Sequence, residues 1–181
     1  MRIVAGQHRS RRLVVPPGKG VRPTSDRARE AIFASLGGMV VGARVLDLFA
    51  GSGAMGLEAL SRGATHVRFV ERDAQALAAI RENVEQLGER DQCTVEKGNA
   101  MTVLKRLAEA GDTFDLIIVD PPYESVGKLA PTLADLLPRV LAPDGRIVLE
   151  TAASDEIAVS GLIERYNRRI AAARIVILGP A

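Results

Sequence analysis

The sequence predicts an α/β protein whose core is a mainly parallel, doubly wound β-sheet. Short β-branched apolar segments alternate with segments of helical periodicity along most of the chain, and glycine or proline turns separate them. The apolar run 114–119 is uninterrupted and stops at two prolines, as a strand buried on both faces does at the carboxyl edge of a sheet. Ligands of open α/β sheets bind at that edge, so functional residues are expected just after the strand ends.

Length and composition indicate one domain with one substantial core, because the chain has 181 residues, 47% hydrophobic and 25% charged. No run of 18 apolar residues occurs and the first residues do not resemble a signal sequence, so we expect a cytoplasmic protein without a membrane partner. Cys93 is the only cysteine, and His8 and His66 are far apart in the sequence. We therefore expect neither a disulfide framework nor a metal site.

Basic residues are concentrated at the start of the chain. Residues 1–30 carry eight basic and two acidic side chains, a net charge of +6, whereas the whole chain carries +2. Such a segment is typical of proteins that bind nucleic-acid phosphates, although a solvated arginine-rich surface has the same composition. Seven of the eight are arginines, whose bidentate binding of phosphate favours the first interpretation. The candidate nucleic-acid contacts are Arg9, Arg11, Arg12, Arg22, Arg27 and Arg29.

The first 36 residues predict a small extension in front of the sheet. Segments 2–5 and 12–15 have strand character around a polar link and predict a β-hairpin, which is too small to be stable alone. After a loop rich in proline and glycine, a Thr-Ser pair can cap a helix that ends near Leu36, and arginines near its start predict a phosphate clamp. We therefore divide the chain into a basic extension, 1–36, and a main domain, 37–181.

A glycine-rich turn, 50–53, follows a predicted strand, 45–49, and leads into a predicted helix. Its glycines belong to the pattern G-x-G-x-x-G, made by Gly51, Gly53 and Gly56, and an acidic residue follows twenty residues after the first of them. This pattern indicates a nucleotide-containing cofactor, but alone it is weakly specific.

Two acidic residues narrow the choice of cofactor. Asp47 lies four residues before the first glycine, where its carboxylate can anchor the cationic amino group of S-adenosylmethionine; this favours that cofactor over NAD. Glu71 follows the predicted strand 66–70 and suits two hydrogen bonds to ribose hydroxyls, which both cofactors require. Asn99 follows the predicted strand 92–96, where its amide can pair with an adenine edge or cap the next helix, and both interpretations stay open.

The strand 114–119 is followed by Asp120, Pro121, Pro122 and Tyr123. Two prolines remove two backbone N–H donors, so this turn presents mostly acceptors and suits an incoming N–H donor. An exocyclic amine of a nucleobase is such a donor, and an aromatic ring beside it can stack on the base for about 1–3 kcal/mol. This turn therefore predicts catalysis on a nucleobase amine, rather than a simple proline-rich loop.

The remaining segments complete the alternation of helices and strands. They predict helices over 73–87, 101–110, 126–137 and 154–163, a turn at 143–145, and strands over 146–150, 166–170 and 174–178, the last two as an antiparallel pair.

Several motifs together resemble a known family. The order of DLFAGSG (47–53), Glu71 and DPPY (120–123) is similar to class I S-adenosylmethionine-dependent methyltransferases acting on exocyclic amines. RIVAG (2–6), RPTSD (22–26) and REAIF (29–33) resemble the RsmD family, which methylates N2 of one guanine in bacterial 16S ribosomal RNA. The resemblance implies a Rossmann-like fold with a seven-stranded sheet and an antiparallel last strand. It also implies 16S rRNA in a small-subunit assembly particle as substrate, a cytoplasmic location, and a protein that we expect to be a monomer.

The resemblance also implies site residues, matched position by position. The catalytic residues are Asp120, Pro121, Pro122 and Tyr123, and the cofactor contacts are Asp47, Phe49, Ala50, Gly51, Gly53, Glu71, Arg72, Asn99 and Ala100. Three alternatives remain: an adenine-N6 methyltransferase acting on DNA, an NAD-dependent oxidoreductase, and a noncatalytic RNA-binding assembly factor. Many members of the wider superfamily have an acidic residue at the position of Asn99.

Overall fold

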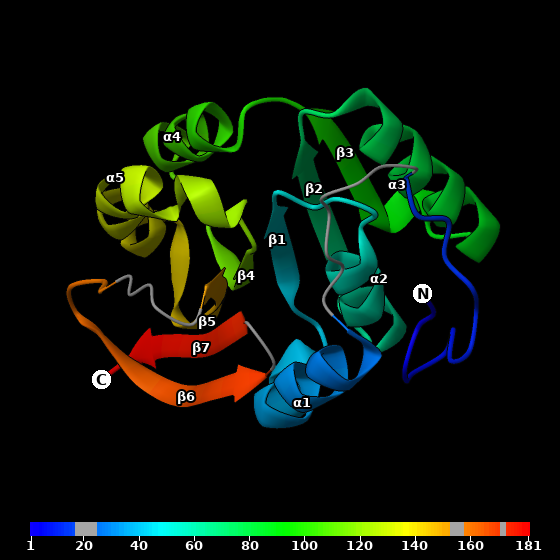
Figure 1. Cartoon of the computed structure of the whole chain (residues 1–181), viewed down its shortest axis with the longest axis horizontal. Coiled ribbons are helices and arrows are strands. Elements are labelled where there is room, and N and C mark those ends of the chain that lie inside the picture. Colours follow the sequence, from blue (N-terminus) through cyan, green and yellow to red (C-terminus); the bar gives the residue numbers. More distant parts are fainter. Residues whose placement is uncertain (17–24, 153–157, 171–172) are drawn as a thin grey trace.

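The computed structural model describes residues 1–16, 25–152, 158–170 and 173–181 (Figure 1). Its centre is a seven-stranded sheet in the order β3-β2-β1-β4-β5-β7-β6. The strands are β1 (Arg44–Leu48), β2 (His66–Glu71), β3 (Cys93–Lys97), β4 (Phe114–Val119), β5 (Leu141–Ala152), β6 (Leu162–Ile170) and β7 (Ala173–Pro180). All neighbouring strands are parallel except β7, which is antiparallel to both β5 and β6. The predicted mainly parallel sheet with an antiparallel last strand is confirmed.

Helices cover both faces of the sheet (Figure 1). They are α1 (Asp26–Leu36), α2 (Ala54–Ser61), α3 (Ala74–Leu87), α4 (Ala100–Ala110) and α5 (Val126–Val140), with 3-10 turns η1 (Gly37–Val40), η2 (Arg90–Gln92) and η3 (Tyr123–Ser125). Helices α1, α2 and α3 share one hydrophobic core with the sheet, and α4 and α5 share the core on its other face. Within the described ranges, no helix combines the length and the apolar character that crossing a bilayer requires.

The N-terminal segment lies on the α1–α3 face as a hairpin-like turn rather than as two regular strands. A single antiparallel bridge joins Arg2 to Arg12, and Ile3 N donates to Arg11 O over 3.0 Å. Ile3 and Leu13 are buried in the same core as α1 and α2. The extension therefore has no core of its own, and its stability depends on the main domain, as expected for so short a hairpin.

The segment after α5 corrects two predictions. The predicted turn 143–145 lies inside β5 as an irregularity, because Leu141 pairs with Phe114 and Arg146 pairs with Leu116. Leu141 and Arg146 are five residues apart in β5, whereas their partners in β4 are two residues apart. The additional residues of β5 form a bulge, and the strand continues past it. Helix α5 also continues three residues past its predicted end at Leu137.

The predicted helix 154–163 is also wrong where the structure describes it. Residues 154–157 lie outside the described residues, Gly161 turns the chain with φ of 78°, and Leu162 and Ile163 begin β6. The apolar spacing suited a helix, but pairing with β7 determines the conformation.

Candidate cofactor and catalytic site

Three strand ends meet at the carboxyl edge of the sheet and bring the predicted site together. Leu48, the last residue of β1, pairs with Val70 of β2 and with Val119 of β4. The residues that follow these positions therefore lie side by side: the glycine turn after β1, Glu71 at the end of β2, and Asp120 after β4. The register places the predicted cofactor loop and the predicted catalytic turn at the same edge.

The glycine turn after β1 is tight and requires left-handed backbone. Gly51 has φ of 56° and Gly53 has φ of 77°, which glycine adopts without the steric cost that a side chain imposes. Phe49 has φ of 61°, a conformation that costs about 1–3 kcal/mol in a residue with a side chain and is concentrated at functional sites. A Cβ at Gly56 would lie 2.4 Å from the Phe69 ring, so this glycine permits close packing of α2 on β2.

Asp47 is buried beneath this turn, with 2% of its surface exposed. Its Oδ2 accepts a hydrogen bond from Gly56 N over 2.9 Å. Burial raises the pKa of its carboxyl to about 8 and the charge of Glu71 adds to the rise, while the hydrogen bond from Gly56 opposes it. A cationic group beside this carboxyl would stabilise its ionised form, which fits the amino group of the expected cofactor.

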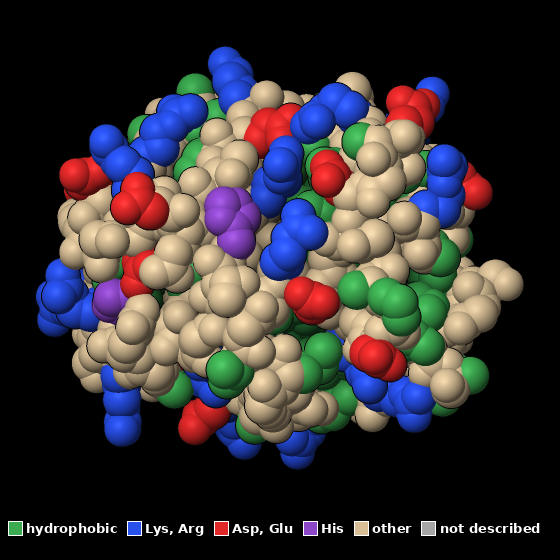
Figure 2. Space-filling model, turned by 180° about the vertical axis from the view of Figure 1, so that it is seen from behind, with side chains coloured by type: hydrophobic (Ala, Val, Ile, Leu, Met, Phe, Trp, Pro, Cys, Tyr) green, Lys and Arg blue, Asp and Glu red, His purple; other side chains and the backbone are tan. Residues whose placement is uncertain are grey.

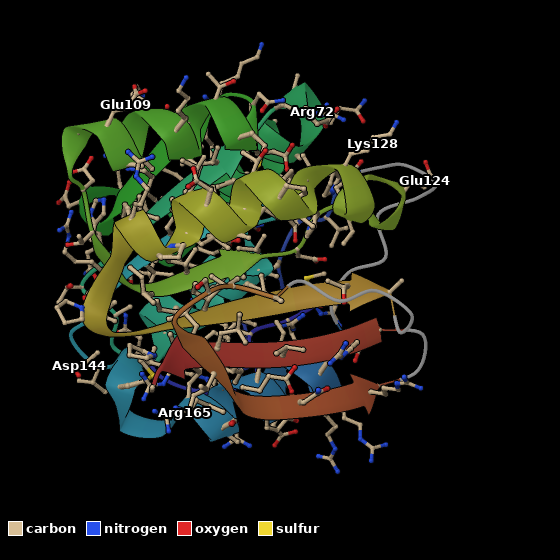
Figure 3. The ribbon with its side chains drawn as sticks, turned by 90° about the vertical axis from the view of Figure 1, so that its left-hand side faces the viewer. Arg72, Glu109, Glu124, Lys128, Asp144 and Arg165 are labelled. Carbon is tan, nitrogen blue, oxygen red and sulfur yellow. The ribbon has the colours of Figure 1, made fainter. Side chains whose placement is uncertain are left out.

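Glu71 is held in place by backbone N–H groups. Its Oε2 accepts from Gly51 N over 2.9 Å, and its Oε1 accepts from Arg72 N over 2.7 Å and from Asp73 N over 2.9 Å. These bonds fix the carboxylate directly beside the glycine turn, where ribose hydroxyls can replace part of this network. Arg72 is exposed at this rim of the molecule (Figure 3).

Asn99 caps α4, which confirms one of the two interpretations of this residue. Its Oδ1 accepts from Met101 N over 2.9 Å and from Thr102 N over 3.3 Å. Gly98 N donates to Glu71 O over 2.9 Å, so Asn99 and the buried Ala100 lie next to the proposed ribose site. Contact with an adenine ring stays a prediction.

The predicted catalytic turn leaves the sheet at the end of β4. Asp120 is half-buried, Pro121 is buried and Pro122 is exposed. Tyr123 begins η3, and Ser125 N donates to Pro122 O over 2.8 Å, which closes the turn. Figure 3 shows Glu124 and Lys128, which follow this turn, on the same side of the molecule as Arg72. The binding of a nucleobase amine by this turn stays a prediction.

Arg29 corrects the predicted nucleic-acid contacts. Its side chain is fully buried, and its guanidinium donates to Arg2 O and to Asp26 Oδ1, the latter over 2.7 Å. These bonds attach α1 to the N-terminal segment, so the guanidinium is not available to phosphates. Arg22 lies outside the described residues, whereas Arg27 is exposed in the first turn of α1.

Arg9 and Arg11 do not share an edge with the predicted catalytic turn. Gln7 N donates to Ser61 O, at the end of α2, over 2.8 Å, and the Arg11 guanidinium donates to Gln86 O, in the last turn of α3, over 2.9 Å. Both helices end near the strand starts, and α3 alone is about 21 Å long. Figure 2 shows that basic and acidic side chains intermingle on the face seen there, rather than forming one basic patch.

Two buried polar residues that the sequence reasoning missed hold the N-terminal segment in place. Glu58 is fully buried in α2 and accepts from Val4 N over 2.7 Å and from Ala5 N over 3.0 Å. Asn83 is fully buried in α3, where it bonds both backbone polar atoms of Val14. Each is a polar residue among the apolar residues of a helix face. In the sequence, this position is the feature that could have indicated a buried polar contact.

Comparisons with known proteins identify the family. A family model described as "Conserved hypothetical protein 95" matches residues 1–178. The Bacillus subtilis "Putative rRNA methyltransferase YlbH" is 40% identical over 151 residues, which cover 83% of this chain and 82% of that protein. The Escherichia coli K12 "Ribosomal RNA small subunit methyltransferase D" is 42% identical over 127 residues, which cover 68% of this chain and 60% of that protein, less than two thirds of its length.

Solved structures agree with this assignment. The structure of "Putative methyltransferase yhhF from Escherichia coli" has a TM-score of 0.84 at 32% identity and covers 99% of this chain and 97% of that one. The structure titled "Crystal structure of SMU.776, a putative methyltransferase complexed with SAH" has a TM-score of 0.68 at 16% identity, covers 88% of this chain and 50% of that one, and shows the shared fold alone. The chain therefore belongs to the conserved hypothetical protein 95 family, that is, the RsmD family of S-adenosylmethionine-dependent methyltransferases.

Proposed function

We propose that this protein methylates the exocyclic N2 of one guanine in bacterial 16S rRNA, guanine 966 in the numbering of that RNA, during small-subunit assembly. One observation carries the proposal: the pairing of Leu48 with both Val70 and Val119 puts the glycine turn, Glu71 and the Asp120 turn at one edge. The relatives named as ribosomal RNA methyltransferases support the choice of substrate.

The residues at this edge fit S-adenosylmethionine, which supplies an electrophilic methyl group on a sulfonium. Glu71 can accept hydrogen bonds from the ribose hydroxyls, and the glycine turn lets the cofactor approach the backbone closely. The buried carboxylate of Asp47 can pair with the cationic amino group. We assign Phe49, Ala50, Gly51, Gly53, Arg72, Asn99 and Ala100 as the further cofactor contacts.

The Asp120 turn prepares the guanine amine for transfer. Its oxygen acceptors take hydrogen bonds from the two N–H groups of the amine, which draws the nitrogen lone pair out of resonance with the ring. The nitrogen would then bond to the methyl carbon while the bond from that carbon to the sulfonium sulfur breaks, and the methylated amine would lose one proton to solvent. Because two prolines in this turn lack N–H groups, few backbone donors compete for that lone pair. Catalysis therefore comes from positioning and charge placement, without a covalent enzyme intermediate.

The target base must leave its stack before its amine can reach this turn. We assign Tyr123 to stack on the extruded guanine, and the exposed arginines of the basic extension, Arg27 foremost, to contact flanking phosphates. Residues 1–36 then serve as an RNA-binding extension of the methyltransferase domain, 37–181, with which they share a core. With a ribosomal substrate, the protein acts in the cytoplasm.

The test is to map methylated guanines by mass spectrometry in rRNA from cells with and without the gene for this protein. Loss of one N2-methylguanine from 16S rRNA, restored by the wild-type protein and not by an Asp120→Ala variant, is the expected result. Unchanged rRNA would refute the proposal. In vitro transfer of labelled methyl to DNA instead of small-subunit particles would favour an adenine-N6 enzyme, and absence of transfer with confirmed particle binding would favour a noncatalytic factor.

A further inference from the structure

Two exposed arginines lie where β6 ends. The proposed function assigns no role to this part of the sheet. Arg168 and Arg169 are near the end of β6, and Arg174 is the second residue of β7. Strand β6 runs in the same direction as β4 and β5, because each of β5 and β6 is antiparallel to β7. The end of β6 therefore belongs to the same carboxyl edge as the catalytic turn.

The strand register gives the separation between these arginines and the catalytic turn. Val119 pairs with Leu149, Leu149 with Val176, and Val176 with Asn167. Three strand spacings separate the first and last of this row, about 15 Å in all. Asp120 and Arg168 are the next residues along their strands, so a nucleic-acid strand only a few nucleotides long reaches from one to the other.

The two arginines at the end of β6 lie on opposite faces of the sheet. Tyr166 and Ile170 pack against the core on the α1 side, and Arg168, which alternates in step with them, faces that side too. Arg27, in the first turn of α1, is exposed on the same side. Arg169 faces the α5 side. Arg168 and Arg169 therefore place positive charge on both faces of the sheet at the end of β6.

Arg168 and Arg169 take part in no ion pair within the described part of the chain. Arg169 lies directly opposite Arg174, and like charges at such a position destabilise a strand pair. Glu164 pairs with Arg174 over 3.2 Å. An anionic partner at this place would offset the repulsion.

We propose that Arg168 and Arg169 bind backbone phosphates of the single-stranded RNA beside the target guanine, so that the end of β6 forms a second RNA-binding surface. The inference rests on the proposed function and specifies where its substrate is held. The guanidinium fork is suited to bidentate phosphate binding, and such contacts position the strand without reading its sequence. This surface lies at the edge where the base enters, unlike Arg9 and Arg11.

The test compares the full-length protein with Arg168→Ala/Arg169→Ala and with a control that loses the same charge elsewhere. Arg165 and Arg90 suit the control, because both are exposed and neither is at the carboxyl edge. Figure 3 shows Arg165 at the end of the molecule opposite Lys128, and Arg90 follows the end of α3. Thermal unfolding of each variant verifies that it is folded.

Binding is measured on small ribosomal subunits from cells that lack the protein, at several salt concentrations, with double-stranded DNA as a competitor. The double variant should bind about tenfold more weakly, with a logarithmic salt dependence shallower by about 1.4, because two single-strand phosphate contacts are lost. The control Arg165→Ala/Arg90→Ala should match the wild type. Methyl transfer at particle concentrations well below saturation should fall by about the same factor as the affinity, because the arginines act by holding the RNA.

The outcomes separate this inference from the proposed function. If the wild type methylates the particles and the double variant binds them as the control does, the RNA surface on β6 is wrong and the proposed function stands. If the wild type neither binds nor methylates the particles, both are wrong. An equal loss of affinity for DNA and for particles would show a general polyanion surface and would also overturn the assignment to the RNA beside the target base.

Discussion

The side-chain amide of Asn83 joins the N-terminal segment to the glycine turn of the proposed cofactor site. Its Nδ2 donates to Ser52 O over 3.1 Å and to Val14 O over 3.0 Å, while its Oδ1 accepts from Val14 N over 2.7 Å. One fully buried residue thus fixes both the segment that leads toward α1 and the turn that we assign to the cofactor. The position of the basic extension and the shape of the cofactor loop are therefore coupled.

Replacing Asn83 with Ala should destabilise the protein by about 3 kcal/mol or more, because three backbone polar atoms lose their buried partner. The variant should also bind S-adenosylhomocysteine more weakly. Chemical denaturation and calorimetry measure the two effects. The control is Gln86→Ala in the same helix, whose exposed side-chain amide donates to Glu82 Oε1 and should contribute little. Equal stability of the two variants would contradict the coupling.

Replacing Gly6 with Ala should detach the N-terminal turn from α2. A Cβ at Gly6 would lie 1.7 Å from Ser61 O, and its φ of 83° is unfavourable for any side chain. We expect a loss of roughly 2–4 kcal/mol in the free energy of unfolding. The same change at Gly127, which has open space around it inside α5, should stabilise by about 0.5–1 kcal/mol. A small effect at Gly6 in urea denaturation would show that this turn is not held by α2.

The structural positions that the sequence predicted correctly are those that local rules determine. A strand that cannot continue into Pro121 and Pro122 presents Asp120 directly after its end, and Glu71 is the last residue of its own strand. Asp73 and Asn99 are capping residues with helices directly behind them, and both cap in the structure. In these places the conformation of a few neighbouring residues fixes where the side chain lies.

The incorrect predictions are those that depend on distant partners. Arg29 belonged to a basic run, but a bond to Asp26 one turn earlier and the backbone of Arg2 draw it into the interior. Glu58 and Asn83 bind residues that lie 53 to 69 positions away. Periodicity within one segment carries no information on such contacts, and the first residues of β6, Leu162 and Ile163, were misassigned to a helix for the same reason.

Because the pKa of Asp47 is raised, we expect the affinity for the cofactor to depend on pH. Its pKa is raised to about 8 in the folded protein, so at neutral pH the carboxyl is largely protonated and cannot attract a cationic amino group. Binding must therefore release a proton, and the affinity for S-adenosylhomocysteine should rise between about pH 6 and about pH 8, by at most tenfold per pH unit. Calorimetry in two buffers of different ionisation enthalpy should detect the released proton.

The Asp47→Asn variant provides the control and a second readout. The folded-state pKa is above the unfolded value, so the unfolded state binds fewer protons and wild-type stability falls as pH rises from about 4 to about 8. An Asn side chain cannot ionise and keeps an oxygen for Gly56 N, so this variant should gain stability relative to the wild type over that range. Its cofactor affinity should be weaker and independent of pH. A parallel pH profile in both proteins would show that Asp47 is not the titrating group.

Asp120 should affect turnover far more than binding of the cofactor. The Asp120→Ala variant removes the carboxylate that we assign to the amine, so the rate of methyl transfer should fall by at least ~10²-fold. Affinity for S-adenosylhomocysteine should change by less than about tenfold, because Glu71 and the glycine turn hold the cofactor. Glu124→Ala, which removes an exposed acid directly after this turn, should transfer methyl groups at nearly the wild-type rate. Single-turnover kinetics on small-subunit particles separate the two effects. If the Asp120 and Glu124 variants transfer at equal rates, the acceptor for the guanine amine must lie elsewhere at this edge.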